Sequence, residues 1–581
     1  MTDNDTLDYE SLLVADFGRG QSRAYLLEQV AGAFRFVAKA EAPTTADLPF
    51  EDLAIGWAQL LRQLEWTTGR AISLRDGVIQ PQAANGDGVD GLLVCTSLPD
   101  PVRVAVLEAG TSPITTPLLE AIKRAHTRVF HVVAPGGRKD GGWAAAQTEA
   151  LRQFRPEMVI LIAGSNHAEA LPRVIQVVKQ TTVVGSIARA VVIADDQAQE
   201  HGLTAFGASV RARSISPVTK QPAEIAADLE RELLEAFRAR ASTPDFKHIV
   251  AGATGEILSR AHAVDLVNRF VARRFGRRVV TIGIDDGVHA HWASPDDGTL
   301  ATIPNVDLGA GISGLTDRDV EEAKTWLPFE ASTDELITWV LNRAIRPWTL
   351  PEHPRDLAIE QALTRQIARR AIAEITRTQP LALSACDLVI GGPAFARWNQ
   401  PGAAALALLD CIDAVPNEGV VDLALDQDGL MAVSGVLGTV DPALASNVFE
   451  YDALIHLGSA VVIGGSTHEG DLACRGEIHY ESGEMAQFSV AAGSVEILPL
   501  RPGETATLVV RPERRFSVGG NAAGKTVTLA DERKIIGGLV GIIIDARSRS
   551  VANGDKNRAQ KVKQWLDAVN GVTPPAARRF A

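Results

Sequence analysis

The chain has 581 residues, of which 46% are hydrophobic and 22% are charged. This balance excludes a largely disordered protein, and the length predicts two to four domains. The 57 basic and 71 acidic residues give a net charge of −14, which disfavours nucleic acid or an anionic membrane as a partner.

Cysteine usage and the N-terminal residues indicate the compartment. The four cysteines, Cys95, Cys386, Cys411 and Cys474, are far apart and form no C-x-x-C motif, which predicts free thiols in a reducing environment. Residues 1–10 are acidic and lack the basic and apolar regions of a signal peptide. The longest apolar runs are too short to span a membrane. We therefore expect a soluble, cytoplasmic protein.

The first half of the chain alternates short β-branched runs with helical patterns. A buried strand is predicted over residues 11–18, followed by a glycine turn, a second strand over 24–29 and an amphipathic helix over 50–66. Further strand–helix pairs lead to two long helices over 223–240 and 257–275. Short strands separated by helices predict a largely parallel sheet with helices on its faces. The acidic stretch DDQAQEHG, by contrast, is interpreted as a surface loop.

The second half begins with the same pattern and then changes. Residues 278–293 predict a strand, a tight turn and a strand, and a helix over 358–375 leads to a strand and turn over 387–398. From about residue 456 onward, at least five short strands are separated by Gly, Pro and charged turns, which predicts an all-β module. An amphipathic helix over 556–569 precedes the C-terminal tail.

The stretch Gly519–Thr526, GGNAAGKT, matches the P-loop motif G-x-x-x-x-G-K-[ST]. A P-loop requires a helix that begins at the Lys-Thr pair, so that the phosphates meet its N-terminus. Here Val527 and Thr528 continue a β-branched run, and another strand follows after a few residues. We interpret the stretch as a glycine turn between two β-strands, with Lys525 in solvent.

A stronger signal for a phosphate site lies near the N-terminus. Asp16 ends a buried strand and is followed by a turn that contains Gly18, Gly20 and Ser22. Backbone N–H groups and hydroxyls of such a hairpin can surround a phosphate. An aspartate beside them can hold Mg²⁺ through bound water. Alone, this pattern is equally compatible with a simple hairpin.

Two further glycine turns strengthen the signal. The run TIGIDDGV is a second strand, turn and strand, and LVIGGPAFARW places Gly391, Gly392 and Pro393 directly after a buried strand. Two phosphate hairpins from two related halves, with a Gly-Gly turn beside the adenosine, are the arrangement of the actin-like ATPase superfamily. That superfamily includes sugar and acetate kinases, heat-shock chaperones and actin.

Within this superfamily, the order and wording of the segments resemble the glutamate mutase accessory family called MutL, which is unrelated to the mismatch-repair protein of that name. The resemblance covers roughly residues 10–440 and is carried by VADFGRGQSRAYLLE, VVTIGIDDGVHAH, NVDLGAG and LVIGGPAFARW. It implies ATP with Mg²⁺ as the cofactor and a protein partner, a cobalamin-dependent mutase. The chain has no D-x-H-x-x-G cobalamin motif, so we do not expect it to be the mutase itself.

The resemblance also implies an α/β fold of the two-lobed actin-like ATPase (ribonuclease-H-like) type. The all-β module expected from the strand pattern lies beyond the segments that carry the resemblance. The expected divisions are a first lobe with an inserted α/β region over 1–278, a second lobe over 279–455, a β-rich module over 456–550, and a helix with its tail over 551–581.

The first hairpin departs from the family pattern at its turn. Asp16, Ser22 and Arg23 keep the frame, but Arg19 and Gly20 replace a pair of small hydroxyl residues. An arginine at this place can clamp a phosphate bidentately, and it can equally fill the pocket.

The second hairpin departs further. Thr281 stands where the leading aspartate belongs, Ile284 replaces a glycine, and Asp285 and Asp286 occupy the stretch of hydroxyl and small residues. Two carboxylates at the phosphate edge would repel a nucleotide by several kcal/mol unless a cation bridges them. We therefore expect ATP hydrolysis to be weakened or lost.

The residues expected to bind the nucleotide lie in or beside these glycine turns. They are Asp16, Gly18, Arg19, Gly20, Gln21, Ser22, Arg23, Thr281, Gly283, Asp285, Asp286, Asp307, Gly309, Gly391, Gly392 and Pro393. Asp16 is also expected to hold Mg²⁺ through bound water. No catalytic residue is identified. His289 and His291 share a strand face that could hold a metal, but no third ligand is evident.

These features predict a nucleotide-binding accessory protein that acts like a chaperone or reactivase toward another enzyme. The alternative is a non-catalytic pseudo-ATPase that serves as a scaffold or interaction protein. A small-molecule kinase is weaker, because no general base is evident near a phosphate turn. The sequence leaves open whether the chain is an enzyme and whether it self-associates.

Overall fold

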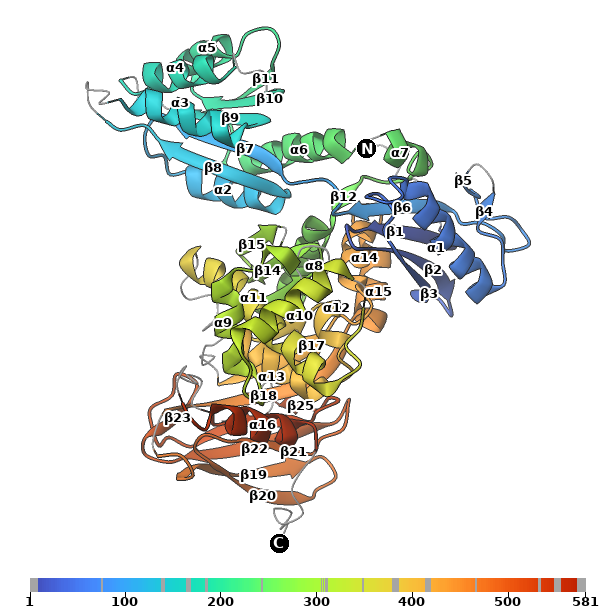
Figure 1. Cartoon of the computed structure of the whole chain (residues 1–581), viewed down its shortest axis with the longest axis vertical. Helices are drawn as coiled ribbons and strands as arrows, with labels where there is room; N and C mark the ends of the chain where they lie inside the picture. The colour runs from blue at the N-terminus through green and yellow to red at the C-terminus, as the bar shows by residue number, and fades with distance from the viewer. Residues whose placement is uncertain are drawn as a thin grey trace. The chain divides into compact units, whose positions relative to one another are not determined.

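The computed structural model describes residues 9–571 apart from 75–76, 137–141, 164–168, 183–186, 242–243, 305, 307, 309–311, 347–348, 379–385, 413–418, 466–467, 531–533 and 548–554. The fold is mixed α/β, as predicted. The chain forms two compact units, one of Met1–Glu51, Ile55–Leu93 and Ala263–Ala581, the other of Asp52–Ala54 and Val94–His262 (Figure 1). Within the described ranges, no helix is long and apolar enough to cross a membrane.

The first sheet is built around the predicted N-terminal hairpin. Its strands are β1 (Ser11–Phe17), β2 (Gln21–Val30), β3 (Ala33–Pro43), β6 (Gly91–Thr96) and β12 (Leu258–Ser259). Their spatial order is β3-β2-β1-β6-β12, which is 3-2-1-4-5 when these strands alone are numbered along the chain. Helix α1 (Leu53–Thr68) buries its apolar stripe, and Trp57 packs on Phe17 with ring centroids 5.4 Å apart. A small hairpin, β4 (Ser73–Leu74) and β5 (Gly77–Val78), follows.

The second unit contains a five-stranded sheet in which all strands are parallel. Its strands are β7 (Val102–Glu108), β8 (Thr127–Val133), β9 (Met158–Ala163), β10 (Arg189–Ala194) and β11 (Arg211–Ile215). The order β8-β7-β9-β10-β11 is the doubly wound order 2-1-3-4-5. The buried strands alternate their side chains between two apolar cores, so both faces need helices.

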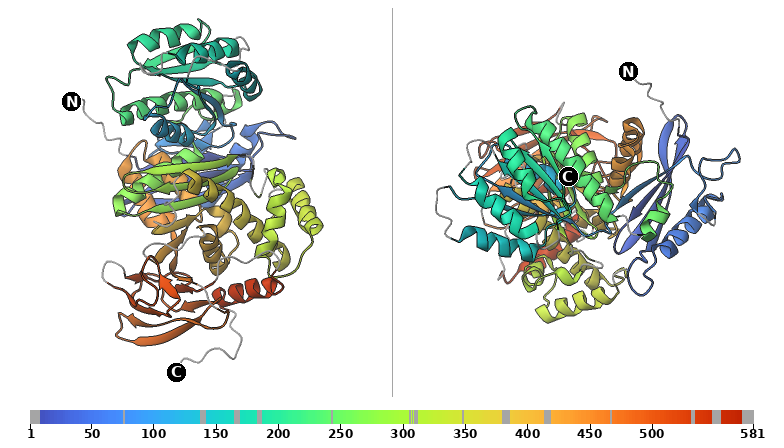
Figure 2. Two further views of the ribbon diagram at one scale, coloured as in Figure 1. Left: turned by 90° about the vertical axis from the view of Figure 1, so that its left-hand side faces the viewer. Right: turned by 90° about the horizontal axis from the view of Figure 1, so that it is seen from above.

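Helices cover both faces of this sheet, as Figure 2 shows. One core includes residues of α3 (Trp143–Phe154), α4 (Leu171–Thr182) and α5 (Asp196–Ala205). The other includes residues of α2 (Thr115–Arg124) and α6 (Pro222–Ala241). A short helix, α7 (Pro244–Ile249), follows α6.

The interpretation of DDQAQEHG as a surface loop is wrong, because most of it forms helix α5. Asp195 is the N-cap of this helix, and its side chain accepts the Ala198 N–H at 3.1 Å. A capping aspartate satisfies a backbone donor at a helix start. The acidic residue therefore marks a helix boundary.

The second half repeats the strand order of the first sheet. Strands β13 (Val279–Ile284), β14 (Gly287–Ala293), β15 (Gly298–Pro304), β16 (Leu388–Gly391) and β17 (Val420–Leu425) lie in the order β15-β14-β13-β16-β17, again 3-2-1-4-5. A large apolar core forms where the helices cover this sheet. The helical elements are α8 (Arg260–Phe275), η2 (Ile312–Gly314), α9 (Asp317–Ala323), η3 (Lys324–Trp326), α10 (Thr333–Ile345), α11 (Pro354–Thr378), α12 (Pro393–Ala396), α13 (Pro401–Ile412), α14 (Leu430–Leu437), α15 (Pro442–Val448) and η4 (Phe449–Ala453).

Helices α8 and α14 cross at a point where only a glycine fits. A Cβ atom placed on Gly435 of α14 would lie 2.0 Å from the carbonyl oxygen of Ala263 in α8. That is far inside van der Waals contact with a backbone atom. The missing side chain therefore sets how closely the two helices approach.

The C-terminal segment is rich in strands, as predicted, but part of it continues the preceding sheet. Strand β18 (Ile455–Gly465) pairs with β17 and extends the sheet. Strand β26 (Ile542–Asp545) pairs with β18, and β21 (Val495–Leu498) pairs with β26. Strand β23 (Phe516–Val518) also pairs with β18. A second sheet contains β20 (Met485–Ala491), β19 (Leu472–Tyr480), β22 (Thr505–Pro512) and β24 (Val527–Leu529), with β25 (Ile535–Ile536) on β22. One apolar core joins both groups of strands.

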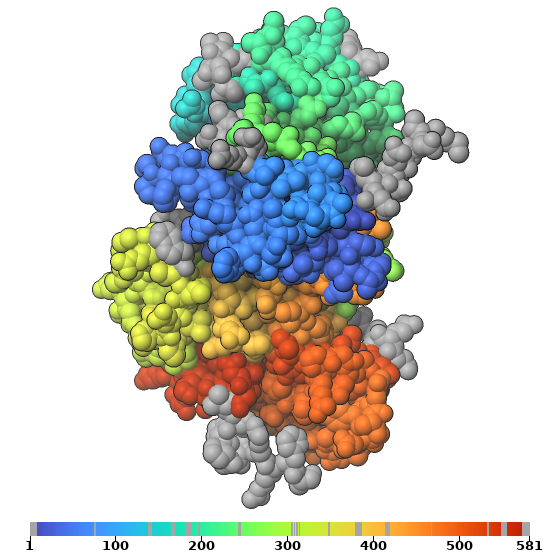
Figure 3. Space-filling model, turned by 90° about the vertical axis from the view of Figure 1, so that its right-hand side faces the viewer, coloured from blue at the N-terminus to red at the C-terminus, as the bar shows by residue number. Residues whose placement is uncertain are grey.

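The predicted C-terminal helix is α16 (Arg558–Val569). Figure 3 shows it in red beside the orange C-terminal strands. Its Trp565 indole donates to the Gly493 carbonyl at 2.7 Å, and its ring lies 5.2 Å from the Arg547 guanidinium carbon. These contacts fasten the helix to the strands.

Four buried ionic side chains join this module to helices α11 and α13. Asp410 of α13 lies 3.3 Å from Arg365 Nε of α11 and 3.0 Å from Arg547 Nη2, which follows β26. Arg547 also makes a bidentate pair with Asp545, at 2.9 Å for both contacts. All four side chains are at most 6% exposed. We refer to these four residues as the buried ion cluster.

The P-loop-like stretch Gly519–Thr526 is a turn between β23 and β24, as predicted. Gly519 and Gly524 have φ angles of 59° and 74°, which favour glycine. Lys525 is exposed. No helix begins at this turn, so the geometry of a P-loop is not formed here.

Candidate functional site

The first glycine hairpin is formed by β1 and β2. Strand β1 is buried along its whole length, and its pairing with β2 places Asp16 opposite Arg23. The Gly18 N–H donates to the Gln21 carbonyl at 3.1 Å and closes the turn. The turn therefore follows directly from a buried, largely apolar strand that is succeeded by glycines.

Hydroxyl groups hold this turn from its outer side. The Ser22 and Thr44 hydroxyl oxygens are 2.8 Å apart, and the Thr44 hydroxyl donates to the Gly18 carbonyl at 2.5 Å. The Thr44 N–H donates to the Gly20 carbonyl at 3.1 Å. Ser22, which the sequence analysis assigned to nucleotide binding, thus has a structural partner in the residue that follows β3.

The second glycine hairpin is formed by β13 and β14, with Asp285 and Asp286 at its turn. The register pairs Ile284 with Val288, so the turn is as tight as predicted. Asp286 has a φ of 55° and Gly287 a φ of 145°. Aspartate and glycine tolerate these left-handed conformations better than other residues do, which explains the Asp-Asp-Gly sequence.

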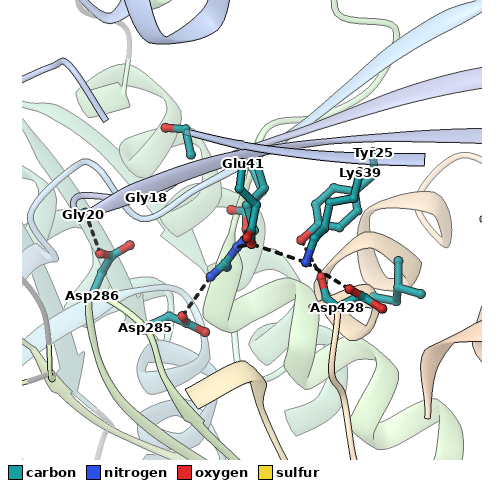
Figure 4. A network of polar contacts seen from close by, with 12 residues as sticks. Gly18, Gly20, Tyr25, Lys39, Glu41, Asp285, Asp286 and Asp428 are labelled. Atoms are coloured by element: carbon teal, nitrogen blue, oxygen red, sulfur yellow. Dashed lines mark hydrogen bonds and ion pairs between the residues drawn. The ribbon is translucent and has the colours of Figure 1, made fainter. Parts of the chain in front are cut away.

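The structure brings the two hairpins together, although more than two hundred residues separate them. The Gly20 N–H donates to Asp286 Oδ1 at 3.1 Å, and Arg23 Nη2 lies 3.4 Å from Asp285 Oδ1 (Figure 4). We call the residues of these contacts and their charged neighbours the hairpin network: Gly20, Arg23, Lys39, Glu41, Asp285, Asp286 and Asp428.

Arg23 is the central cation of the hairpin network. It is 6% exposed and, besides Asp285, it contacts Glu41 at 2.8 Å and Asp16 at 3.8 Å. Burial disfavours the charged guanidinium, but the three carboxylates outweigh burial and raise the pKa of Arg23 well above its ordinary value. Burial also disfavours the charged form of Glu41 and by itself would raise the pKa of this carboxyl. The positive charges of Arg23 and Lys39 outweigh burial, so the pKa of Glu41 is lowered. Arg23 therefore remains charged.

Three members of the hairpin network, Lys39, Glu41 and Asp428, were not predicted from the sequence. Strand register places Glu41 opposite Arg23 and Lys39 opposite Tyr25, and Lys39 Nζ lies 3.0 Å from Asp428 Oδ1. Alternation of Lys39 and Glu41 along β3 was the available signal, because residues two apart share one face of a strand. The sequence signal for Asp428 was weaker. This residue lies shortly after a buried strand and precedes a glycine and an apolar helix.

The third glycine turn lies beside the strand that leads to the second hairpin. The Gly392 N–H donates to the Ile282 carbonyl at 2.8 Å, and a Cβ on Gly392 would lie 3.4 Å from Gly283 Cα. Pro393 is the first residue of α12, where a proline fits because its missing N–H is not needed. The glycine pair thus permits a close approach of two backbone segments.

The remaining predicted residues are placed differently. Thr281 is buried, and its hydroxyl donates to Asn268 Oδ1 at 2.7 Å, in the packing between β13 and α8. Arg19 is half-buried and Gln21 is exposed, both at the turn of the first hairpin. Asp307 and Gly309 lie outside the described residues.

A Mg²⁺ ion held through Asp16 does not fit the arrangement seen here. Asp16 is 2% exposed, and its carboxylate lies 3.8 Å from the Arg23 guanidinium, so a divalent cation would meet a buried positive charge. His289 and His291 have separate partners, Thr302 at 3.3 Å and Asp265 at 3.5 Å. The described part of the chain contains no group of three or more His, Cys, Asp or Glu residues suited to a metal.

Asp426 is a second buried carboxyl close to the hairpin network. It is 4% exposed and accepts the N–H groups of Leu430 and Met431 at 2.7 and 3.2 Å, at the start of α14. Burial raises its pKa to about 7 despite these two hydrogen bonds, and the charges of Asp285 and Asp428 act in the same direction. The carboxyl therefore takes up a proton on folding at pH values between its unfolded pKa and about 7.

This proton uptake predicts a pH dependence of stability. Because the folded state binds the proton more tightly, the contribution of Asp426 is fully present below about pH 4 and is lost as the pH rises through about 7, by up to about 4 kcal/mol. We expect Asp426→Asn to flatten the fall in thermal midpoint between pH 5 and pH 8. Thermal unfolding of both proteins at four pH values measures the difference, and parallel curves would contradict it.

No protein-family model matches the chain, and no curated protein sequence matches it. Among solved structures, the chain is similar to a carbohydrate kinase from Novosphingobium aromaticivorans, with 12% identity, 78% of this chain and 94% of that chain covered, and a TM-score of 0.25. It is also similar to a Ppx/GppA enzyme from Aquifex aeolicus, with 8% identity, 77% and 95% covered, and a TM-score of 0.18.

A third similar structure is an exopolyphosphatase from Cytophaga hutchinsonii, with 8% identity, 77% and 93% covered, and a TM-score of 0.19. TM-scores this low establish neither a shared fold nor a shared activity. None of the three is described as a glutamate mutase accessory protein, so the resemblance to the MutL family remains a prediction.

Proposed function

We propose that the chain is a nucleotide-binding accessory protein with a two-lobed actin-like fold, chaperone-like toward another enzyme, in which ATP hydrolysis is weakened or lost. The observation that carries the proposal is the meeting of the two glycine hairpins at Gly20 and Asp286. Each hairpin comes from the first two strands of a sheet with the order 3-2-1-4-5. Two equivalent hairpins that face each other are what a phosphate chain bound between two lobes requires.

The chemistry of the hairpins supports binding more than turnover. Phosphoryl transfer needs preorganised donors and a metal around the transferred group. Here the second hairpin presents two carboxylates, and a buried arginine stands 3.8 Å from the aspartate expected to hold the metal. The carboxylates repel the negative charge of the transition state, and the arginine disfavours the metal ion that would offset that charge.

The partner follows from the family resemblance. Accessory proteins of the MutL type are thought to support a cobalamin-dependent carbon-skeleton mutase, so we propose an enzyme of that class as the partner.

A scaffold without nucleotide is the second candidate, and one observation favours it. In the hairpin network, the Gly20 N–H already has an acceptor and the Arg23 guanidinium already has carboxylates. A site whose charges are satisfied internally needs no ligand to be stable. In this case the protein would act through its surfaces alone.

Calorimetric titration with ATP and Mg²⁺ distinguishes the two candidates. We expect saturable binding by the wild-type chain and its loss in Asp16→Ala, because this change removes one of the three carboxylates that hold the Arg23 guanidinium beside the first hairpin. Neither protein should release phosphate above background. Lys525→Ala is the matched control, because it changes the exposed lysine of the P-loop-like turn and should leave binding unchanged. If the folded wild-type protein gives no binding heat, the scaffold is favoured. If the wild type hydrolyses ATP and Asp16→Ala does not, the proposal that hydrolysis is weakened or lost is wrong.

A further inference from the structure

Asp286 is the acceptor for a backbone N–H group at the turn of the first hairpin. A phosphate bound by the first hairpin would accept hydrogen bonds from the backbone N–H groups of the turn. The Gly20 N–H instead donates to the Asp286 carboxylate at 3.1 Å. A carboxylate oxygen and a phosphate oxygen are both anionic acceptors, so they compete for the same donor.

We infer that the turn Asp285–Asp286 is an internal competitor that latches the two hairpins together, and that a ligand with a terminal phosphate must displace it in order to bind. This inference rests on the proposed function and adds its regulation. The protein's own aspartate then acts as the resting occupant of the first hairpin.

Further contacts within the same compact unit support the latch. Arg23 Nη2, on strand β2, lies 3.4 Å from Asp285 Oδ1. The other aspartate of the turn is therefore also held by the first hairpin. Farther along the sheet, the Tyr25 hydroxyl donates to the Asp428 carbonyl at 2.8 Å, and Lys39 lies 3.0 Å from the Asp428 carboxylate. The contacts lie in a row along one face of β2 and β3. Displacing Asp286 breaks the outermost contact of that row first.

The contact between the two hairpins lies at a turn whose residues have positive φ angles. Asp286 has a φ of 55°, and Gly287, with a φ of 145°, follows it. A Cβ on Gly20 would have the Asp286 carboxylate oxygen as its nearest neighbour, at 3.9 Å. The approach of the two hairpins is therefore made by a polar contact and not by tight apolar packing.

Asp286→Asn tests the latch with little disturbance of the backbone, because asparagine also tolerates a positive φ. We expect the variant to bind ATP in the presence of Mg²⁺ about tenfold more tightly than the wild type in calorimetric titration, which corresponds to about 1.4 kcal/mol. Inorganic tripolyphosphate should show the same gain, because the terminal phosphate is the competing group. Asp296→Asn is the matched control: it removes the same charge from an exposed turn of the same unit and should leave affinity unchanged.

Amide hydrogen exchange of a peptide that contains Gly20 gives a readout that needs no ligand. We expect exchange in this hairpin to be several-fold faster in Asp286→Asn than in wild type and in Asp296→Asn. Equal nucleotide binding by wild type and Asp286→Asn would overturn the latch and leave the proposed function standing. Unchanged exchange would also overturn the latch. Absence of binding in every protein, with faster exchange in Asp286→Asn, would overturn the proposed function and keep the contact as a structural clasp.

Discussion

Replacement of Asp410 by alanine is expected to lower the free energy of unfolding by about 3–5 kcal/mol, because it leaves the buried Arg365 without its carboxylate partner. Asp410 bridges Arg365 and Arg547, and the Arg365 side chain is 3% exposed. Burial already lowers the pKa of Arg365, and the Asp410 charge opposes that shift. Arg547 keeps Asp545, so most of the cost should fall on Arg365.

Chemical denaturation of wild type, Asp410→Ala and Glu374→Ala measures this effect. Glu374 pairs with Arg377 on the exposed side of α11, where both side chains are more than 40% exposed, and exposed pairs contribute at most about 1 kcal/mol. Glu374→Ala should therefore lower stability by less than about 1 kcal/mol. Similar losses in the two variants would show that the buried ion cluster does not fasten the C-terminal module to the helices.

The second large effect is expected at the crossing of α8 and α14. Gly435→Ala should destabilise the protein by about 2–3 kcal/mol, because the new methyl would lie 2.0 Å from the Ala263 carbonyl oxygen. The gain in helix propensity, about 1 kcal/mol, is smaller than this overpacking cost. The helices must separate, and the start of α14, beside Asp428, must move with them.

Gly438→Ala provides the comparison at the end of the same helix. A Cβ on Gly438 would meet its nearest neighbour, the Ser434 carbonyl oxygen, at 3.4 Å, which is ordinary contact. Its stability should stay within about 0.5 kcal/mol of wild type. Thermal and chemical unfolding measure the stability of Gly435→Ala and Gly438→Ala. Equal stability of the two variants would contradict a close approach of α8 and α14.

Local patterns were enough to predict much of the fold. The buried run before Asp16, the Asp-Asp-Gly turn and the helical stripe of α1 each follow from periodicity and turn chemistry within a few residues. The P-loop-like stretch was rejected for the same kind of reason, because the β-branched Val527 and Thr528 oppose a helix start. The stretch that begins at Asp195 was predicted to be a loop, and this was wrong because aspartate favours both loops and helix N-caps.

The contacts of the site could not be predicted in the same way. That Asp286 reaches the Gly20 N–H depends on how two sheets pack, and no local pattern encodes that distance. The sequence did show that two carboxylates at a phosphate edge were unusual, but it did not show that a backbone donor and Arg23 would satisfy them. Continuation of the sheet of β13, β14, β15, β16 and β17 through β18 was not predicted, because strand pairing joins residues far apart in the sequence.

The pairing of β6 with β12 has a consequence for the history of the chain. Leu258 pairs with Cys95 and Ser259 with Thr96, so the two ends of the intervening segment adjoin. A segment whose ends adjoin can be acquired or excised without rerouting the rest of the polypeptide. Residues 97–257 are thus expected to behave as a cassette, and relatives that carry a different cassette, or none, would still have the strand order 3-2-1-4-5 in their first sheet.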